Sequence, residues 1–153
     1  MPHRPIEHLH EPLARRRILI VDSDQRVRAS LSGLVGLGDG IEVVGAAGSA
    51  AEAIDVATRL RPDVVLVDPR LPDIDAGLRF IAGVRRLIPA VCVLVMSWTP
   101  ARESGLPASI ADAIIDKAAE PAVLLDAIIA ASCGDADEPL AAHPSTQGRG
   151  FVL

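Results

Sequence analysis

The stretch that decides the fold runs from Pro62 to Gly77 and reads P-D-V-V-L-V-D-P-R-L-P-D-I-D-A-G. Its apolar run, Val64 to Val67, ends in Asp68, and the prolines that follow cannot continue a strand. An apolar run without alternation predicts a strand covered on both faces, as in parallel sheets, which bind ligands at the carboxyl ends of their strands. Asp68 is therefore predicted at a strand end where chemistry takes place. The alternative is a purely structural role, in which Asp68 caps its loop or the helix that begins near Asp75.

Composition limits the kinds of protein this chain can be. Its 153 residues are half hydrophobic, which suits one compact domain with a core of Val, Ile, Leu and Ala. The net charge of -5 argues against a nucleic-acid partner. No apolar run is long enough to span a membrane and no signal-peptide core is present, so we expect a cytoplasmic protein without a membrane partner. Cys92 and Cys133 are expected to be buried free thiols.

Strands and helices are predicted to alternate along the chain. Four more apolar runs predict strands at Ile18 to Val21, Ile41 to Ala47, Val91 to Met96 and Ala111 to Ile115. Helices are predicted after Asp24 or Ser23, after the capping box that Ser49 begins, near Asp75 and from Pro121 to Gly134. From Ser97 to Ala108 the helical pattern fails, because two prolines and a glycine interrupt it.

This alternation predicts right-handed βαβ crossovers and an open parallel sheet. The expected fold class is α/β, a flavodoxin-like doubly wound (βα)5 sandwich whose five strands have the order 2-1-3-4-5. We expect a flexible tail at residues 1–16, a single domain at residues 17–134 and a disordered tail at residues 135–153.

Polar residues at the predicted strand ends should meet at one edge of this sheet. They are Asp22, Asp68, Ser97 and Lys117. Two carboxylates, a hydroxyl and an ammonium suit a divalent cation such as Mg²⁺ and a phosphoryl group, and Asp68 could attack phosphorus as a nucleophile. Lys117 is the only lysine of the chain. Taken singly, Lys117 could be a solvated strand-end residue and Ser97 a turn former; together we favour a functional site.

The four strand-end motifs resemble those of one known family. They are I-L-I-V-D ending at Asp22, the run through Asp68 quoted above, V-L-V-M-S ending at Ser97 and I-I-D-K ending at Lys117. In this combination they resemble the receiver domain of bacterial response regulators, the CheY-like proteins of two-component signalling. The resemblance covers roughly Arg17 to Gly134.

The resemblance implies that Asp68 accepts a phosphoryl group from a histidine kinase or phosphotransfer protein, that Ser97 hydrogen-bonds it and that Lys117 pairs with it. It also implies a Mg²⁺ site formed by Asp22, Asp68 and the backbone carbonyl of Arg70. No enzyme activity is expected beyond self-phosphotransfer and slow loss of the aspartyl phosphate. The output should be a contact with a downstream protein target, and a homodimer is left open.

Several positions depart from the family pattern, including Ala76 with Gly77, which alter the loop after Asp75. Ser23 replaces the second acid after the first strand, so Mg²⁺ should bind weakly, with Ser23 or Asp24 as a further candidate ligand. Trp98 replaces a small residue and could cover the phosphate entrance. Ile114 stands where an aromatic switch residue is expected, and Ala118 replaces a proline.

Two alternative functions remain beside the phosphorylated receiver. One is a pseudo-receiver, a binding module that keeps the fold and signals without phosphorylation. The other is a small phosphatase of the haloacid-dehalogenase type, because Asp22 and Asp24 form a D-x-D pattern. That pattern needs Thr or Val two residues after its second Asp, where Arg26 stands, and the phosphatase is the weaker alternative.

Overall fold

The computed structural model describes residues 15–99, 103–107 and 109–131. Residues 1–14 of the predicted N-terminal tail, the predicted tail at residues 135–153 and the predicted helix end at Gly134 all lie outside these ranges. None of the helices among the described residues is long and apolar enough to cross a membrane.

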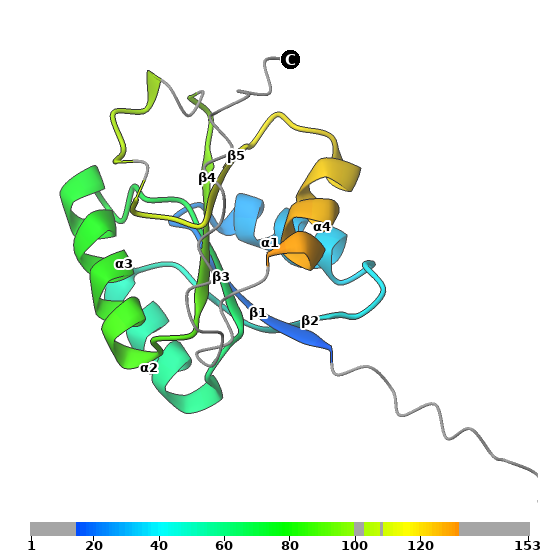
Figure 1. Ribbon diagram of the computed structural model, residues 1–153, viewed down its shortest axis with the longest axis horizontal. Helices are drawn as coiled ribbons and strands as arrows, with labels where there is room; N and C mark the ends of the chain where they lie inside the picture. The colour runs from blue at the N-terminus through cyan, green and yellow to red at the C-terminus, as the bar shows by residue number, and fades with distance from the viewer. Residues whose placement is uncertain (1–14, 100–102, 108, 132–153) are drawn as a thin grey trace, which may run out of the picture.

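Among the described residues, five parallel strands form the central sheet. They are β1 (Arg16–Val21), β2 (Ile41–Ala47), β3 (Val64–Val67), β4 (Cys92–Ser97) and β5 (Ala113–Asp116). Their order is β2-β1-β3-β4-β5, which confirms the predicted flavodoxin-like topology. The chain enters all five strands at one edge of the sheet and leaves them at the other, so the ends of β1 and β3 are neighbours (Figure 1).

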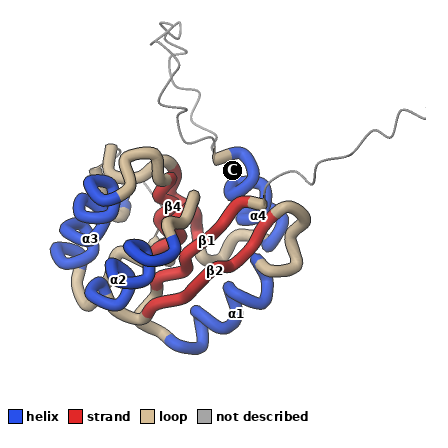
Figure 2. Tube along the Cα trace, turned by 90° about the horizontal axis from the view of Figure 1, so that it is seen from below, coloured by secondary structure: helices blue, strands red, loops and turns tan. Residues whose placement is uncertain are grey.

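Within the described part of the chain, four helices cover the two faces of the sheet. They are α1 (Gln25–Val35), α2 (Ala50–Leu60), α3 (Ile74–Leu87) and α4 (Pro121–Ala130). Helices α2 and α3 lie on one face and α1 and α4 on the other, as Figures 1 and 2 show. Three helices begin at side-chain caps, since Asp24, Ser49 and Asp73 each accept hydrogen bonds from backbone amides of the first turn.

Each face of the sheet has its own apolar core. Successive residues of β3 point to opposite sides, so Val65 and Val67 pack under α2 and α3, whereas Val64 and Leu66 pack under α1 and α4. All four are buried. The expectation of buried free thiols is wrong for Cys92, which is buried but disulfide-bonded, and Cys133 lies outside the described residues.

The connection between β4 and β5 differs from the five-helix pattern that a (βα)5 sandwich implies. Its described residues, 98–99, 103–107 and 109–112, contain no α-helix. Gly105 has a φ of +68°, which suits glycine, and Pro107 lacks the amide that a helix interior would need. The end of this connection is secured to the sheet by Asp112, whose carboxylate accepts a hydrogen bond of 2.8 Å from the amide of Val93.

Candidate functional site

The end of β1 places Asp22 in the interior beside its own loop. Counting backbone and side chain together, Asp22 is 2% exposed and is buried. Its amide donates to the carbonyl of Ala47 at 3.1 Å, and its Oδ1 accepts from the amide of Asp24 at 2.9 Å. The guanidinium of Arg28 donates to the Asp22 carbonyl at 2.6 Å. The Asp22 backbone is therefore held at both its amide and its carbonyl, and one carboxylate oxygen is held by the Asp24 amide.

The end of β3 places Asp68 next to β1. Its amide donates to the carbonyl of Val21 at 2.9 Å, and its Oδ1 accepts from the amide of Arg70 at 2.9 Å. The loop that follows packs closely against α3 at Gly77. A Cβ atom at Gly77 would lie 1.6 Å from the carbonyl oxygen of Pro69, so only glycine fits at this helix position.

Lys117 joins the two acids. Its amide donates to the carbonyl of Ser97 at 2.9 Å, which fixes the end of β5 against the end of β4. Its Nζ forms ion pairs with Asp22 Oδ2, at 2.7 Å, and with Asp68 Oδ2. The side chains of Lys117, Asp22 and Asp68 are only 4%, 3% and 14% exposed. This buried ammonium is shared between two carboxylates.

The environment of Lys117 stabilises its charged form. Burial by itself would lower the pKa of Lys117, but the hydrogen bonds to Asp22 and Asp68, together with the charges of both acids, raise the pKa above its ordinary value of 10.5. The lysine therefore remains an ammonium at neutral pH.

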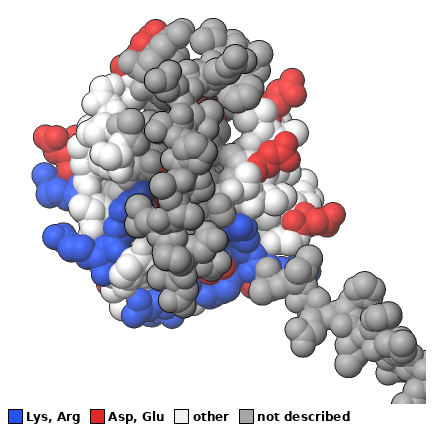
Figure 3. Space-filling view, in the orientation of Figure 1, with Lys and Arg blue, Asp and Glu red and all other residues white. Residues whose placement is uncertain are grey.

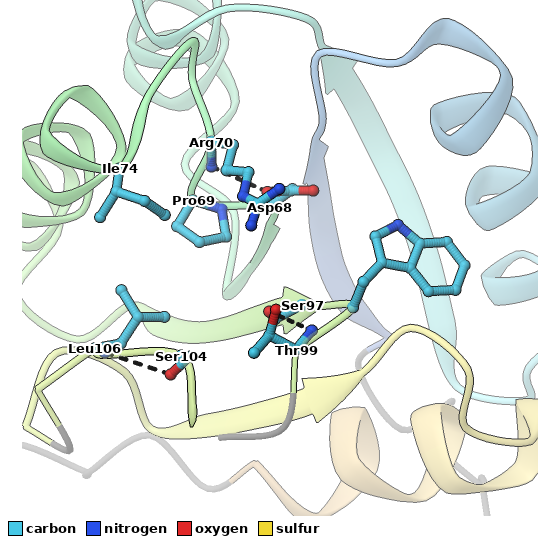
Figure 4. A pocket seen from close by; sticks show the side chains of 9 residues that line it. Asp68, Pro69, Arg70, Ile74, Ser97, Thr99, Ser104 and Leu106 are labelled. Atoms are coloured by element: carbon cyan, nitrogen blue, oxygen red, sulfur yellow. Dashed lines mark hydrogen bonds between the residues drawn. The ribbon is translucent and has the colours of Figure 1, made fainter. Parts of the chain in front are cut away.

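A small cavity opens beside Asp68. It has a volume of about 30 Å³, room for about two water molecules. Asp68 and Ser97 lie across it from each other, with Arg70, Ile74 and Leu106 around the rim (Figure 4). The Oγ of Ser97 accepts a hydrogen bond of 3.0 Å from the amide of Thr99, so its own proton can be donated into the cavity.

Trp98 stands between this cavity and a larger groove. The indole is 64% exposed, and its ring centroid lies 5.9 Å from Lys117 Nζ, within range of a cation–π contact. Trp98 and Lys117 also line the groove, which has a volume of about 300 Å³ and whose far wall is formed by α1 residues such as Val27 and Leu31. Trp98 thus forms one wall of the cavity beside Asp68 and is open to solvent.

The donor set for a divalent cation is smaller than the family pattern provides. Asp22 and Asp68 supply two adjacent carboxylates, a set that Mg²⁺ can use together with water and phosphate oxygens. The carboxylate of Asp24 instead caps α1, accepting from the amide of Arg26 at 2.8 Å. Ser23 is exposed. No group of three potential His, Cys, Asp or Glu ligands occurs among the residues that the structure describes.

All four predicted strand-end residues lie at one edge of the sheet. Lys117 contacts both acids directly, whereas Ser97 faces Asp68 across the cavity. Sequence reasoning missed Arg28, and no motif marks its reach from α1 to the Asp22 carbonyl. It also missed why position 77 is glycine, although a glycine early in a predicted helix is a signal of close packing.

Comparison with known proteins agrees with this geometry. Residues 18–129 match the family described as the response regulator receiver domain. A curated protein-glutamate methylesterase/protein-glutamine glutaminase from Dechloromonas aromatica (strain RCB) is 39% identical over 87 residues, which cover 57% of this chain and 25% of the relative. This chain spans about a quarter of the length of the first such relatives, at 25% and 24%.

Solved structures show the same fold. A CheY-like receiver domain protein from Methanospirillum hungatei JF-1 has a TM-score of 0.64 and 27% identity, with 75% of this chain and 91% of that chain covered. The response regulator domain of Thermotoga maritima CheB also has a TM-score of 0.64, with 25% identity and coverage of 79% and 98%. Because residues 18–129 match the family and the strands have the order β2-β1-β3-β4-β5, this chain belongs to the response regulator receiver domain family.

Proposed function

We propose that this protein accepts a phosphoryl group on Asp68 from a histidine kinase or phosphotransfer protein and signals through contacts with a downstream protein. The observation that carries the proposal is the buried arrangement at the ends of β1 and β3. There the Lys117 ammonium bridges Asp22 and Asp68, beside a cavity that Ser97 lines. The cytoplasm, where such kinases present their phosphohistidine, is the expected location.

Each residue has a distinct part in the proposed transfer. A carboxylate oxygen of Asp68 forms a bond to phosphorus while the bond from phosphorus to the donor imidazole nitrogen breaks, and the imidazole leaves with a proton from solvent. Lys117 offers positive charge to the transferred oxygens, and the Ser97 hydroxyl donates a hydrogen bond to one of them. Beyond this self-phosphotransfer and slow hydrolysis of the aspartyl phosphate, no enzyme activity is proposed.

Mg²⁺ is the proposed cofactor and should bind weakly. Asp22, Asp68 and the backbone carbonyl of Arg70 would hold it, and when bound it would neutralise charge on the phosphoryl oxygens. The Oδ2 atoms of both acids already pair with Lys117, so the metal competes with an ammonium. Position 23 adds a neutral hydroxyl where another carboxylate would add charge.

Ser23→Asp tests whether the neutral residue at position 23 is the cause of the proposed weak Mg²⁺ binding. The added carboxylate should tighten Mg²⁺ binding by roughly tenfold, because Mg²⁺ affinity depends on the charge of its ligands. Isothermal titration at fixed pH measures the change. Gln25→Glu, two positions further along at the exposed first residue of α1, is the matched control, since it adds the same charge at a position not expected to ligate the metal. Equal affinity in Ser23→Asp and the parent protein would contradict the proposed weakness at position 23.

A second candidate function is a receiver that acts without phosphorylation. The specific observation in its favour is that Lys117 already compensates the acid pair, so the folded state needs no metal to hold two buried carboxylates together. The methylesterase activity in the names of the curated relatives is not proposed for this chain, because the matched region covers about a quarter of those proteins, 25% in the first.

Phosphorylation with a small acyl phosphate and Mg²⁺ tests the proposal. Mass spectrometry should find one acid-labile phosphate adduct on the full chain, and Asp68→Asn should abolish it. Asp75→Asn, an exposed acid in the first turn of α3, should leave the adduct unchanged. An adduct that survives Asp68→Asn would show that another residue is the nucleophile, and Asp22 would be the first candidate. A parent protein that takes up no phosphate from either this donor or a phosphorylated kinase would establish the second candidate.

A further inference from the structure

A group of arginines lies at the sheet edge opposite the acid site, where the strands begin and the helices end. We call Arg16, Arg17, Arg59, Arg61 and Arg86 the arginine row. Figure 3 shows positive side chains gathered in the lower half of the visible face, and most of the negative ones toward its top and right margins. The chain as a whole has a net charge of -5, so this edge runs against the overall sign.

Hydrogen bonds show that the row is continuous across the end of the fold. Arg17 Nη1 donates to the carbonyl of Arg61 at 2.9 Å, and Arg61 Nη1 donates to the carbonyl of Leu87 at 2.9 Å. Arg16 Nη1 donates to the carbonyl of Ala131 on the other side of the sheet. The row therefore extends from the end of α4, past the start of β1, to the ends of α2 and α3.

Helix capping explains part of the row but not all of it. Carbonyls at helix ends lack intrahelical partners and attract cations, so Arg16, Arg17 and Arg61 have a structural role there. Arg59 and Arg86 lie in the last turns of α2 and α3, where a positive charge is favoured by the helix dipole, but their side chains form neither a hydrogen bond nor an ion pair with any residue that the structure describes. Their guanidinium donors are therefore available to a further acceptor.

The acids near the row are fewer than its five arginines. Asp63 accepts from the backbone amide of Arg17 at 2.9 Å, and Glu42 is the register partner of Arg17 on β2. Asp112 pairs with Arg85 at 3.2 Å. A guanidinium has five N–H donors, and one carbonyl uses only one or two of them. Arg17 and Arg61 are thus fixed in position with donors left over, which lowers the entropy cost of binding a further acceptor.

We propose that the arginine row is a docking surface for an acidic segment of a partner protein. Guanidinium forks match carboxylates in a two-point geometry, and a row that crosses the rim from helix end to helix end suits an extended chain. A long nucleic acid or an anionic membrane would also be repelled by the acidic remainder of the molecule. An extended peptide bound along one edge avoids that repulsion. A partner held at this edge leaves the opposite edge, with Asp68, open to a phosphodonor.

Fluorescence anisotropy with the full chain tests the proposal. The probe is a short labelled peptide of alternating Glu and Ser, compared with the same peptide carrying Gln in place of Glu. The acidic peptide should bind more tightly, and salt should weaken it because the contacts are between solvent-exposed charges. Arg59→Gln combined with Arg86→Gln should weaken binding roughly three- to tenfold, as expected for two exposed charge pairs. Thermal melting should show that this double variant folds normally.

The matched control removes two arginines elsewhere. Arg26→Gln combined with Arg79→Gln changes the net charge equally, on exposed helix positions outside the row, and should leave peptide affinity unchanged. Equal weakening in both double variants, equal binding of the neutral peptide, or no binding of the acidic peptide would overturn the proposal. Tighter binding of duplex DNA or of phosphatidylserine vesicles than of the peptide would overturn the assignment to an acidic protein segment.

Discussion

The acid site at the ends of β1 and β3 is enclosed, whereas the connection after β4 is more exposed to solvent. At the first, the side chains of Asp22, Asp68 and Lys117 are almost fully enclosed, and every carboxylate oxygen has a partner. At the second, Trp98 is 64% exposed, and the described residues of the connection form no α-helix. The same sheet edge therefore carries a tightly fixed acid site and a loosely covered neighbour.

This difference separates two requirements of a receiver. An acid site needs only strand ends and short loops, and both are present here. A switch also needs an element with two discrete arrangements, for which the family uses the aromatic of the fifth strand and the helix before it. Here Ile114 is half-buried against the core and that helix is absent from the described residues. A substitution can therefore alter the proposed phosphorylation of Asp68 without altering how it is transmitted to other surfaces, and the reverse also holds.

Removing the shared ammonium should have the largest effect. Lys117→Met should lower the free energy of unfolding by about 3 kcal/mol, because it leaves two enclosed carboxylates facing each other without a cation. Urea unfolding at neutral pH measures the loss. Arg85→Met, which removes the partly exposed ion pair to Asp112 and a hydrogen bond to the Ile110 carbonyl in the neighbouring connection, is the comparison and should cost about 1 kcal/mol.

A double variant checks that the loss comes from the charges. Adding Asp22→Asn to Lys117→Met should restore most of the stability, since one carboxylate then remains without a like-charged neighbour. If Lys117→Met costs no more than Arg85→Met, the acid site is no better fixed than the connection after β4, and the contrast between the two regions is wrong.

Close packing behind Asp68 should give the next largest effect. Gly77→Ala should destabilise the protein by about 2 kcal/mol, because a Cβ atom 1.6 Å from the Pro69 carbonyl forces α3 away from the loop. Gly83→Ala on the same helix is the control. Its Cβ atom would meet Ile54 at an ordinary 3.7 Å, so helix propensity should make that variant equal to or more stable than the parent by up to about 1 kcal/mol. Similar unfolding midpoints for both variants would contradict the tight packing.

The pH dependence of stability gives a smaller but cleaner test. The pKa of Lys117 is raised above 10.5 in the folded protein, so its stabilising contribution is fully present below 10.5 and is lost as pH rises through the folded value. The chain has no tyrosine and no other lysine, so few other groups titrate in this window. Unfolding free energies should fall above pH 10.5 in the parent, and Lys117→Met should lack that fall. Parallel curves for both proteins would mean that Lys117 is not paired as described.

The sequence predicted the fold and the strand-end residues because their signals are local. Apolar runs such as Val64 to Val67 end in polar residues, and the sheet order then brings those residues together. Contacts between distant side chains were not predictable in the same way. The sharing of Lys117 between Asp22 and Asp68, and the reach of Arg28 to a carbonyl, depend on side-chain rotamers and on packing across loops.

Amide chemical shifts with a phosphoryl mimic test the central contrast most directly. Beryllium fluoride with Mg²⁺, added to the labelled protein, should move the amide signals of Asp68, Ser97 and Lys117. Signals of the first residues of β5 and of α4 should stay in place, because no described helix and no aromatic at Ile114 connect them to the acid site. Shifts that spread from Ala113 through Leu124 would contradict this account and would show that the receiver transmits phosphorylation by another route.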